Sequence, residues 1–195
     1  MKNPKFLQIE FSPQNAKFLN LQYIPDIANL LYANRGELFD RFFGINEENK
    51  IEKTIELVNS FAPAFWAIVD PKTNELAGVV YLYDWIGDPE FCYSVKVSTC
   101  FKRKFWGKFA HRAGKLFIRY VCAKYRPLLL CAEVYEMNSL PKRLLSRLGF
   151  KQTYEKPMAT MVNGISVSVF GYQFWNNRNL MQSEERMITG VCCPY

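Results

Sequence analysis

The chain has 195 residues, 49% of them hydrophobic, which is enough to bury one substantial core. It contains no run of the roughly 20 apolar residues that span a bilayer, and its first residues lack the apolar run of a signal peptide. These features exclude a membrane-spanning protein, and we expect a soluble, cytoplasmic chain with no membrane partner. The net charge of +7 is unevenly placed, because residues 102–126 contain nine Lys or Arg and no acid.

The first half of the chain predicts one strand, two helices and three further strands. Residues 6–11 alternate apolar and polar side chains, which is typical of a strand. Apolar residues at helical spacing predict helices over 25–43 and 46–60. Apolar, aromatic-rich runs separated by Asp- and Pro-containing turns predict three antiparallel strands, at 64–69, 76–85 and 91–101.

The second half predicts two helices and three strands. Residues 107–122 place apolar side chains on one helical face, and a strongly apolar strand, which we expect to be buried on both faces, follows over 128–135. Asn138 is a candidate N-cap for a helix that Gly149 closes. The last two strands, joined by an Asn163-Gly164 turn, are expected at 150–155 and 165–174. We predict one domain over 1–175 and a C-terminal tail over 176–195.

The cysteines and the single histidine predict no metal site. Six cysteines stand at positions 92, 100, 122, 131, 192 and 193 without Cys-x-x-Cys spacing, and His111 is the lone histidine. We interpret them as free thiols in a reducing compartment. Cys92, Cys122 and Cys131 lie within apolar patterns and are expected to pack as small core residues.

The basic stretch from Lys102 to Val121 combines a Trp-Gly break with the start of a helix directly after a predicted strand. A helix N-terminus presents unpaired backbone N–H groups and the positive end of the helix dipole, so a phosphate group can bind there with Lys or Arg nearby. Charge alone leaves three readings open, namely an anionic ligand, nucleic acid or a solvated helix face.

Two stretches resemble the GNAT (GCN5-related N-acetyltransferase) superfamily. The family's first signature is Arg or Gln, two residues, Gly, one residue, and Gly or Ala, and it aligns with the run from Lys104 to Phe109. The second is Asn138 followed by Gly149-Phe150. The motif Phe-Trp-Gly-Lys at residues 105–108 most resembles the ribosomal-protein acetyltransferase branch of the superfamily. The sequence departs from the signature at Lys104 and at Phe109, where a small residue is usual.

The resemblance implies a GNAT-like α/β (α+β) fold with a mixed, mostly antiparallel central sheet flanked by helices. It also implies that acetyl-CoA is the co-substrate. Its pantetheine arm would lie along the strand near Val97, Ser98 and Thr99, and a backbone N–H near Val97 would polarise the thioester carbonyl. The pyrophosphate would lie over Lys104, Trp106, Gly107, Lys108, Phe109 and Ala110, and Asn138 would contact the other side of the arm.

Direct attack of an amine on a thioester needs a base for the amine and an acid for the leaving thiol. Glu133, Glu90 and Asp84 are the acids near the expected centre, and Glu133 is preferred because an apolar strand would raise its pKa. A solvated strand end or an ion pair is the competing interpretation. Relatives place a Tyr where this chain has Leu145, and Tyr93 and Tyr135 are the candidate substitutes, although either fits a core-edge aromatic equally.

The leading hypothesis is therefore acyl-CoA-dependent acyl transfer to an amine of a small molecule, peptide or protein. One alternative is a GNAT-like protein that binds or modifies nucleic acid through the basic stretch. The other is a non-catalytic interaction domain. The oligomeric state and the acceptor stay open.

Overall fold

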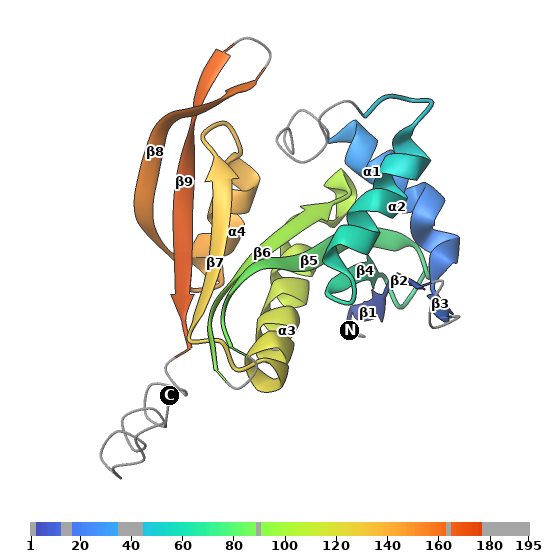
Figure 1. Ribbon diagram of the computed structural model, residues 1–195, viewed down its shortest axis with the longest axis horizontal. Coiled ribbons are helices and arrows are strands. Elements are labelled where there is room, and N and C mark those ends of the chain that lie inside the picture. Colours follow the sequence, from blue (N-terminus) through green and yellow to red (C-terminus); the bar gives the residue numbers. More distant parts are fainter. Residues whose placement is uncertain (1–2, 13–16, 35–44, 89–90, 163–164, 177–195) are drawn as a thin grey trace.

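The computed structural model describes residues 3–12, 17–34, 45–88, 91–162 and 165–176. Its centre is a seven-stranded sheet in the order β1-β4-β5-β6-β7-β9-β8, and β2 and β3 form a separate pair (Figure 1). The strands are β1 Lys5–Gln8, β2 Glu10–Ser12, β3 Lys17–Leu19, β4 Phe65–Val69, β5 Leu76–Gly87, β6 Cys92–Phe101, β7 Leu129–Tyr135, β8 Lys151–Val162 and β9 Ile165–Trp175.

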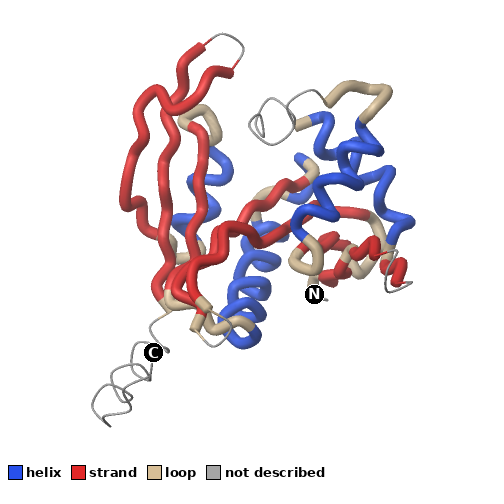
Figure 2. The backbone as a smooth tube through the Cα atoms, viewed as in Figure 1, coloured by secondary structure: helices blue, strands red, loops and turns tan. Residues whose placement is uncertain are grey.

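Helices cover both faces of the sheet (Figure 2). Side chains of α1 (Ile24–Ala33) and α2 (Lys50–Phe61) pack in one core with one face of β4 and β5. Side chains of α3 (Lys108–Lys124) and α4 (Ser139–Arg147) pack in a second core on the opposite face. The sheet is therefore the middle layer of three.

The strands β4, β5 and β6 form the predicted antiparallel series. Successive side chains of a strand point to opposite faces, so a central strand between two helical layers must be apolar throughout. Val79 belongs to the core of α1 and α2 and the adjacent Val80 to the core of α3 and α4. This double burial explains why the strand sequence is an apolar run without alternation.

The strands β6 and β7 pair in parallel, and α3 makes the crossover between them. All other strand pairs within the described residues are antiparallel. The helix forms where expected because Ala110, Ala113, Phe117 and Val121 recur on one face and are all buried. The prediction of a mixed, mostly antiparallel sheet flanked by helices is confirmed.

Two strand predictions were wrong in detail. The expected strand over 6–11 is two strands, because β1 pairs with β4 of the large sheet, whereas β2 pairs with β3 in a separate sheet. The fully buried Ile9 lies between them and still donates its backbone N–H to the Phe65 carbonyl of β4. The strand β7 was expected to be buried on both faces. Its residues Leu130, Ala132 and Val134 are buried against α3 and α4, but Cys131, Glu133 and Tyr135 are only half-buried on the other face.

Several predicted boundaries lie at the edge of the described residues. The helix expected over 25–43 corresponds to α1, which ends at Ala33, and residues 35–44 lie outside the described residues. The predicted turn at Asn163-Gly164 and the tail residues 177–195 also lie outside them. The strand expected over 150–155 extends to Val162. Asn176, the first residue of the predicted tail, is buried and donates from Nδ2 to the Pro127 carbonyl at 3.1 Å.

Candidate functional site

A cavity of about 240 Å³ opens where β6 and β7 diverge. The two strands pair in parallel only from Ser94 to Lys96, opposite Leu129 to Cys131. Beyond that point β6 forms one wall and β7 the other, and α4 closes the side. Six residues singled out in the sequence line this cavity, namely Val97, Ser98, Thr99, Glu133, Tyr135 and Asn138.

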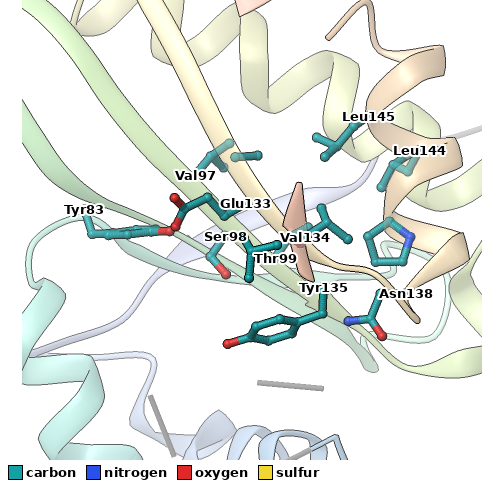
Figure 3. Close-up of a pocket in the computed structure, with 13 residues that line it drawn as sticks. Tyr83, Val97, Ser98, Thr99, Glu133, Val134, Tyr135, Asn138, Leu144 and Leu145 are labelled. Carbon is teal, nitrogen blue, oxygen red and sulfur yellow. The ribbon is translucent and has the colours of Figure 1, made fainter. Parts of the chain in front are cut away.

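Figure 3 shows these side chains gathered around the cavity, with Leu144 and Leu145 of α4 beside them. Leu145 stands where the family resemblance led us to expect a Tyr, and its side chain contributes to the apolar core. Tyr83 enters from β5 and is buried. The cavity therefore combines an apolar wall from α4 with hydroxyl and carboxyl groups from the strands.

Two donors hold one carboxylate oxygen of Glu133. The Tyr154 hydroxyl donates to Oε1 at 2.6 Å, and Lys156 Nζ lies 3.0 Å from the same oxygen. The other oxygen, Oε2, lies 3.5 Å from Lys96 Nζ, which also pairs with Asp84 Oδ2 at 3.0 Å. A carboxylate has about four acceptor sites, so Oε2 retains acceptor capacity for a ligand.

These contacts lower the pKa of Glu133, whereas the sequence predicted a raised pKa. Burial raises the pKa of this carboxyl, but the hydrogen bonds from Tyr154 and Lys156 and the charges of Lys96 and Lys156 outweigh burial. Burial and the hydrogen bond to Glu133 also raise the pKa of Tyr154. Near neutral pH, Glu133 is thus a carboxylate and Tyr154 a neutral phenol.

The lowered pKa of Glu133 predicts a pH-dependent contribution to stability. A carboxyl whose pKa is lower in the folded than in the unfolded state stabilises the fold above the unfolded value, about 4.3 for Glu. That contribution is lost as the pH falls through the folded value. We expect the difference in unfolding free energy between the wild type and Glu133→Gln to be constant above about pH 5.5 and to shrink towards pH 3. Urea denaturation over this range measures it, and a pH-independent difference would contradict the lowered pKa.

The first signature residues lie outside the cavity, at the start of α3. Gly107 is the N-cap, with φ 90° and ψ −125°, and no side chain caps the helix. Lys108 is exposed beside it. Ala110 is fully buried, and Trp106 and Phe109 pack against the core.

The bulky Phe109 is directed towards the core. Its ring lies 5.0 Å from that of Phe105, measured between centroids. Lys104 is engaged elsewhere, since its Nζ lies 2.6 Å from Glu75 Oε2. Arg112, in the same basic stretch, donates to the side chain of Asn3.

The structure does not bring Tyr93 to the cavity. Tyr93 lies near the start of β6, its side chain is exposed, and it is not among the residues that line the cavity. Residues that sequence reasoning missed are Tyr83, Lys96, Tyr154 and Lys156. Lys96 shares a strand face with Ser98, which period-two alternation could have indicated. Gly171, inside a predicted strand, was a signal of close approach by another group.

The described residues also bear on metal binding, on the state of the thiols and on membrane insertion. Within the described part of the chain, no three His, Cys, Asp or Glu side chains cluster so that they could hold a metal ion. Cys92, Cys100, Cys122 and Cys131 are free thiols. No described helix has the length and apolar character needed to cross a membrane.

Solved acetyltransferase structures share this fold. Spermidine N-acetyltransferase from Vibrio cholerae, in complex with CoA and spermine, is 16% identical with a TM-score of 0.70 over 91% of this chain and 98% of that chain. Ribosomal-protein-S5-alanine acetyltransferase from Vibrio fischeri is 16% identical with a TM-score of 0.67 over 91% and 95%. A GNAT-family acetyltransferase from Bacillus anthracis is 10% identical with a TM-score of 0.70 over 90% and 96%.

Sequence comparison identifies the family. A search among curated proteins gives no match. The family model described as Acetyltransferase (GNAT) domain matches residues 22–151, which is more than half of the chain. The chain therefore belongs to the GNAT acetyltransferase family and is an acyl-CoA-dependent N-acetyltransferase.

Proposed function

We propose that the chain transfers the acetyl group of acetyl-CoA to a primary amine in the cavity between β6 and β7. One observation carries this proposal: the divergence of the two strands brings Val97, Ser98 and Thr99 opposite Glu133 and Tyr135. The edge of β6 that faces β7 has no registered partner beyond Lys96 among the described residues. Backbone groups along this edge can therefore bind an extended ligand such as a pantetheine arm.

The start of α3 would hold the pyrophosphate of the co-substrate. Gly107 and Lys108 are exposed at the helix N-terminus, where backbone N–H groups and the helix dipole favour an anion. The inward packing of Phe109 keeps its ring off this surface. Lys104 would exchange its exposed ion pair with Glu75 for a phosphate, and Trp106 and Ala110 would position the turn. Asn138, at the N-cap of α4, would contact the arm from the opposite wall.

The chemistry is a direct transfer. The Glu133 carboxylate accepts a proton from the substrate ammonium, the neutral amine attacks the thioester carbonyl carbon, and the carbon–sulfur bond breaks. Backbone N–H near Val97 polarises the carbonyl oxygen. Tyr135, which lines the cavity, donates the proton that the leaving sulfur takes up, and it regains a proton from the nitrogen as the amide forms. The one net proton released is the one that Glu133 accepted, which passes to solvent. Tyr93 is too far along β6 to share the role of Tyr135.

The acceptor is a primary amine of a polyamine or a protein N-terminus. Structural neighbours include a spermidine N-acetyltransferase and a ribosomal L7/L12 alpha-N-protein acetyltransferase. The carboxylates of Asp84 and Glu133 are paired with the ammonium groups of Lys96 and Lys156. These charges balance, so they do not favour a polyamine over a protein N-terminus as the acceptor. We place the protein in the cytoplasm, in keeping with its free thiols. The family match and the acetyltransferase neighbours leave the nucleic-acid alternative without support.

Two measurements test this function. Calorimetric titration should detect acetyl-CoA binding, with a control titration of duplex DNA at two salt concentrations. Mass spectrometry should then detect a gain of one acetyl group on spermidine or on a peptide with a free N-terminus. Failure to bind acetyl-CoA would overturn the proposal, as would binding without transfer to any primary amine of the panel.

A further inference from the structure

Tyr154, Gly171 and Glu133 stand in line across three adjacent strands. Glu133 on β7 is in register with Gly171 on β9, and Gly171 is in register with Tyr154 on β8. Adjacent strands are about 4.8 Å apart, so the backbones of Glu133 and Tyr154 are separated by about 10 Å. The Tyr154 hydroxyl nevertheless donates to Glu133 Oε1 at 2.6 Å. Its ring must therefore cross β9 to reach a residue two strands away.

Gly171 makes this crossing possible. A Cβ placed at position 171 would overlap Cε1 and Cζ of the Tyr154 ring. The ring thus lies directly over the backbone of β9, in the space that a side chain would otherwise fill. We call this space the Gly171 notch. Any larger residue at 171 would push the ring away from Glu133, because the backbone of a central strand cannot move aside easily.

A register shift in β8 brings Tyr154 to the notch. Gln152 is opposite Tyr172, but the next pair is Tyr154 with Gly171, so β8 contains one extra residue, Thr153, at this point. Such a bulge redirects the following side chain. Here it places the longest hydroxyl-bearing side chain of the strand opposite the only residue type that leaves room for it.

Tyr154 is better suited than Lys156 to fix the carboxylate. The side chain of Lys156 is 57% exposed, and exposed ion pairs contribute little because water competes for both charges. A short O–H···O⁻ hydrogen bond is of the strong, charge-assisted type and is directional. It occupies Oε1 and thereby fixes where Oε2 points, towards Lys96.

We propose that Tyr154 is a positioning residue for acetyl transfer, which reaches through the Gly171 notch and holds Oε1 of Glu133 so that Oε2 faces the acceptor amine. This inference rests on the proposed function of Glu133 as the proton acceptor. Tyr154 itself touches neither substrate. It acts through the orientation of a carboxylate, and the same contact keeps that carboxylate ionised.

Steady-state kinetics of Tyr154→Phe test this role, because the variant keeps the ring and removes the hydroxyl. We expect kcat to fall about 10- to 100-fold, the range for loss of a hydrogen bond to a charged group, with an unchanged KM for acetyl-CoA. In a Glu133→Gln background the same change should have no further effect. The matched control is Tyr172→Phe, which removes a hydroxyl on the opposite face of the sheet that bonds only distantly to Gln152, at 3.5 Å. An equal loss in both backgrounds, or unchanged kcat in Tyr154→Phe, would overturn the proposal.

Gly171→Ala tests the notch. The added methyl should displace the Tyr154 ring and lower kcat as much as Tyr154→Phe does, and the double variant should be no worse than either single one. Thermal unfolding monitors whether Gly171→Ala folds, and Tyr154→Phe carries the test if it does not. Full activity of a folded Gly171→Ala variant would show that the ring does not need the notch.

NMR titration of ¹³C-labelled tyrosines gives a readout that needs no activity. The Tyr154 resonance is the one missing from Tyr154→Phe. In the wild type it should titrate well above an ordinary tyrosine, and in Glu133→Gln it should titrate at lower pH, since the negative charge beside it is gone. An unchanged titration would refute the contact. If the contact is present but the wild type acetylates no amine, the proposed function fails while the Tyr154–Glu133 pair stands.

Discussion

Replacing Glu133 by Gln should lower kcat/KM for acetyl transfer by about 10²- to 10⁴-fold, the usual contribution of a positioned base. The amide keeps the shape of the carboxylate and can still accept hydrogen bonds from Tyr154 and Lys156, so the cavity wall should keep its form. It cannot take the proton of the substrate ammonium. We therefore expect the loss in kcat, with a nearly unchanged KM for acetyl-CoA, because Glu133 contacts the acceptor side.

The measurement is steady-state kinetics with the amine that the acceptor panel identifies, over a range of pH. The loss should diminish at high pH, where more of the amine is already neutral. Glu155→Gln is the matched control, because Glu155 is an exposed carboxylate on the same sheet that does not line the cavity. A Glu133→Gln variant within about threefold of the wild type would remove Glu133 from the mechanism, since even the weakest positioned bases contribute more.

Elements with strong local signals could be predicted from sequence. The antiparallel series β4, β5 and β6 follows from apolar runs separated by turn residues, and α3 follows from its apolar face. The division of residues 6–11 between two sheets could not be predicted, because the alternation of apolar and polar side chains continues across it. The division depends on which strands β1 and β2 pair with, namely β4 and β3, and β4 lies far from β1 in the sequence.

The electrostatics of Glu133 were equally out of reach. An acid in an apolar strand suggests burial and a raised pKa, but its two nearest donors come from β8, with β9 between them and Glu133. Their distance depends on the strand order, on the extra residue Thr153 and on the absence of a side chain at Gly171. Each of these is a tertiary feature. Val97, Ser98, Thr99 and Asn138, by contrast, were named through the family resemblance, and Glu133 and Tyr135 through the need for a base and an acid. The divergence of β6 and β7 that brings these residues to one cavity leaves no periodic signal in the sequence.

Gly107→Glu should weaken acetyl-CoA binding by on the order of 100-fold, because an opposed pair of like charges costs several kcal/mol when it is partly desolvated. Gly107 is the exposed N-cap of α3, and apart from the adjoining stretch of chain no heavy atom lies within 4 Å of a Cβ built there. The new carboxylate would thus enter open space at the anion-binding end of the helix, where the pyrophosphate is expected. Calorimetric titration with acetyl-CoA measures the change in affinity.

Gly107→Gln separates the effect of charge from that of the backbone. With φ at 90°, position 107 disfavours any side chain, so both variants should lose about 1–3 kcal/mol of stability. The Glu variant should regain about 0.3–1 kcal/mol of it, since an acid near a helix N-terminus is favourable. The two variants should therefore rank differently in the two measurements. Gly107→Glu should be the more stable variant, and it should bind acetyl-CoA more weakly than Gly107→Gln does. Equal loss of affinity in both variants would mean that backbone distortion is responsible, and undiminished affinity in Gly107→Glu would move the phosphate site away from α3.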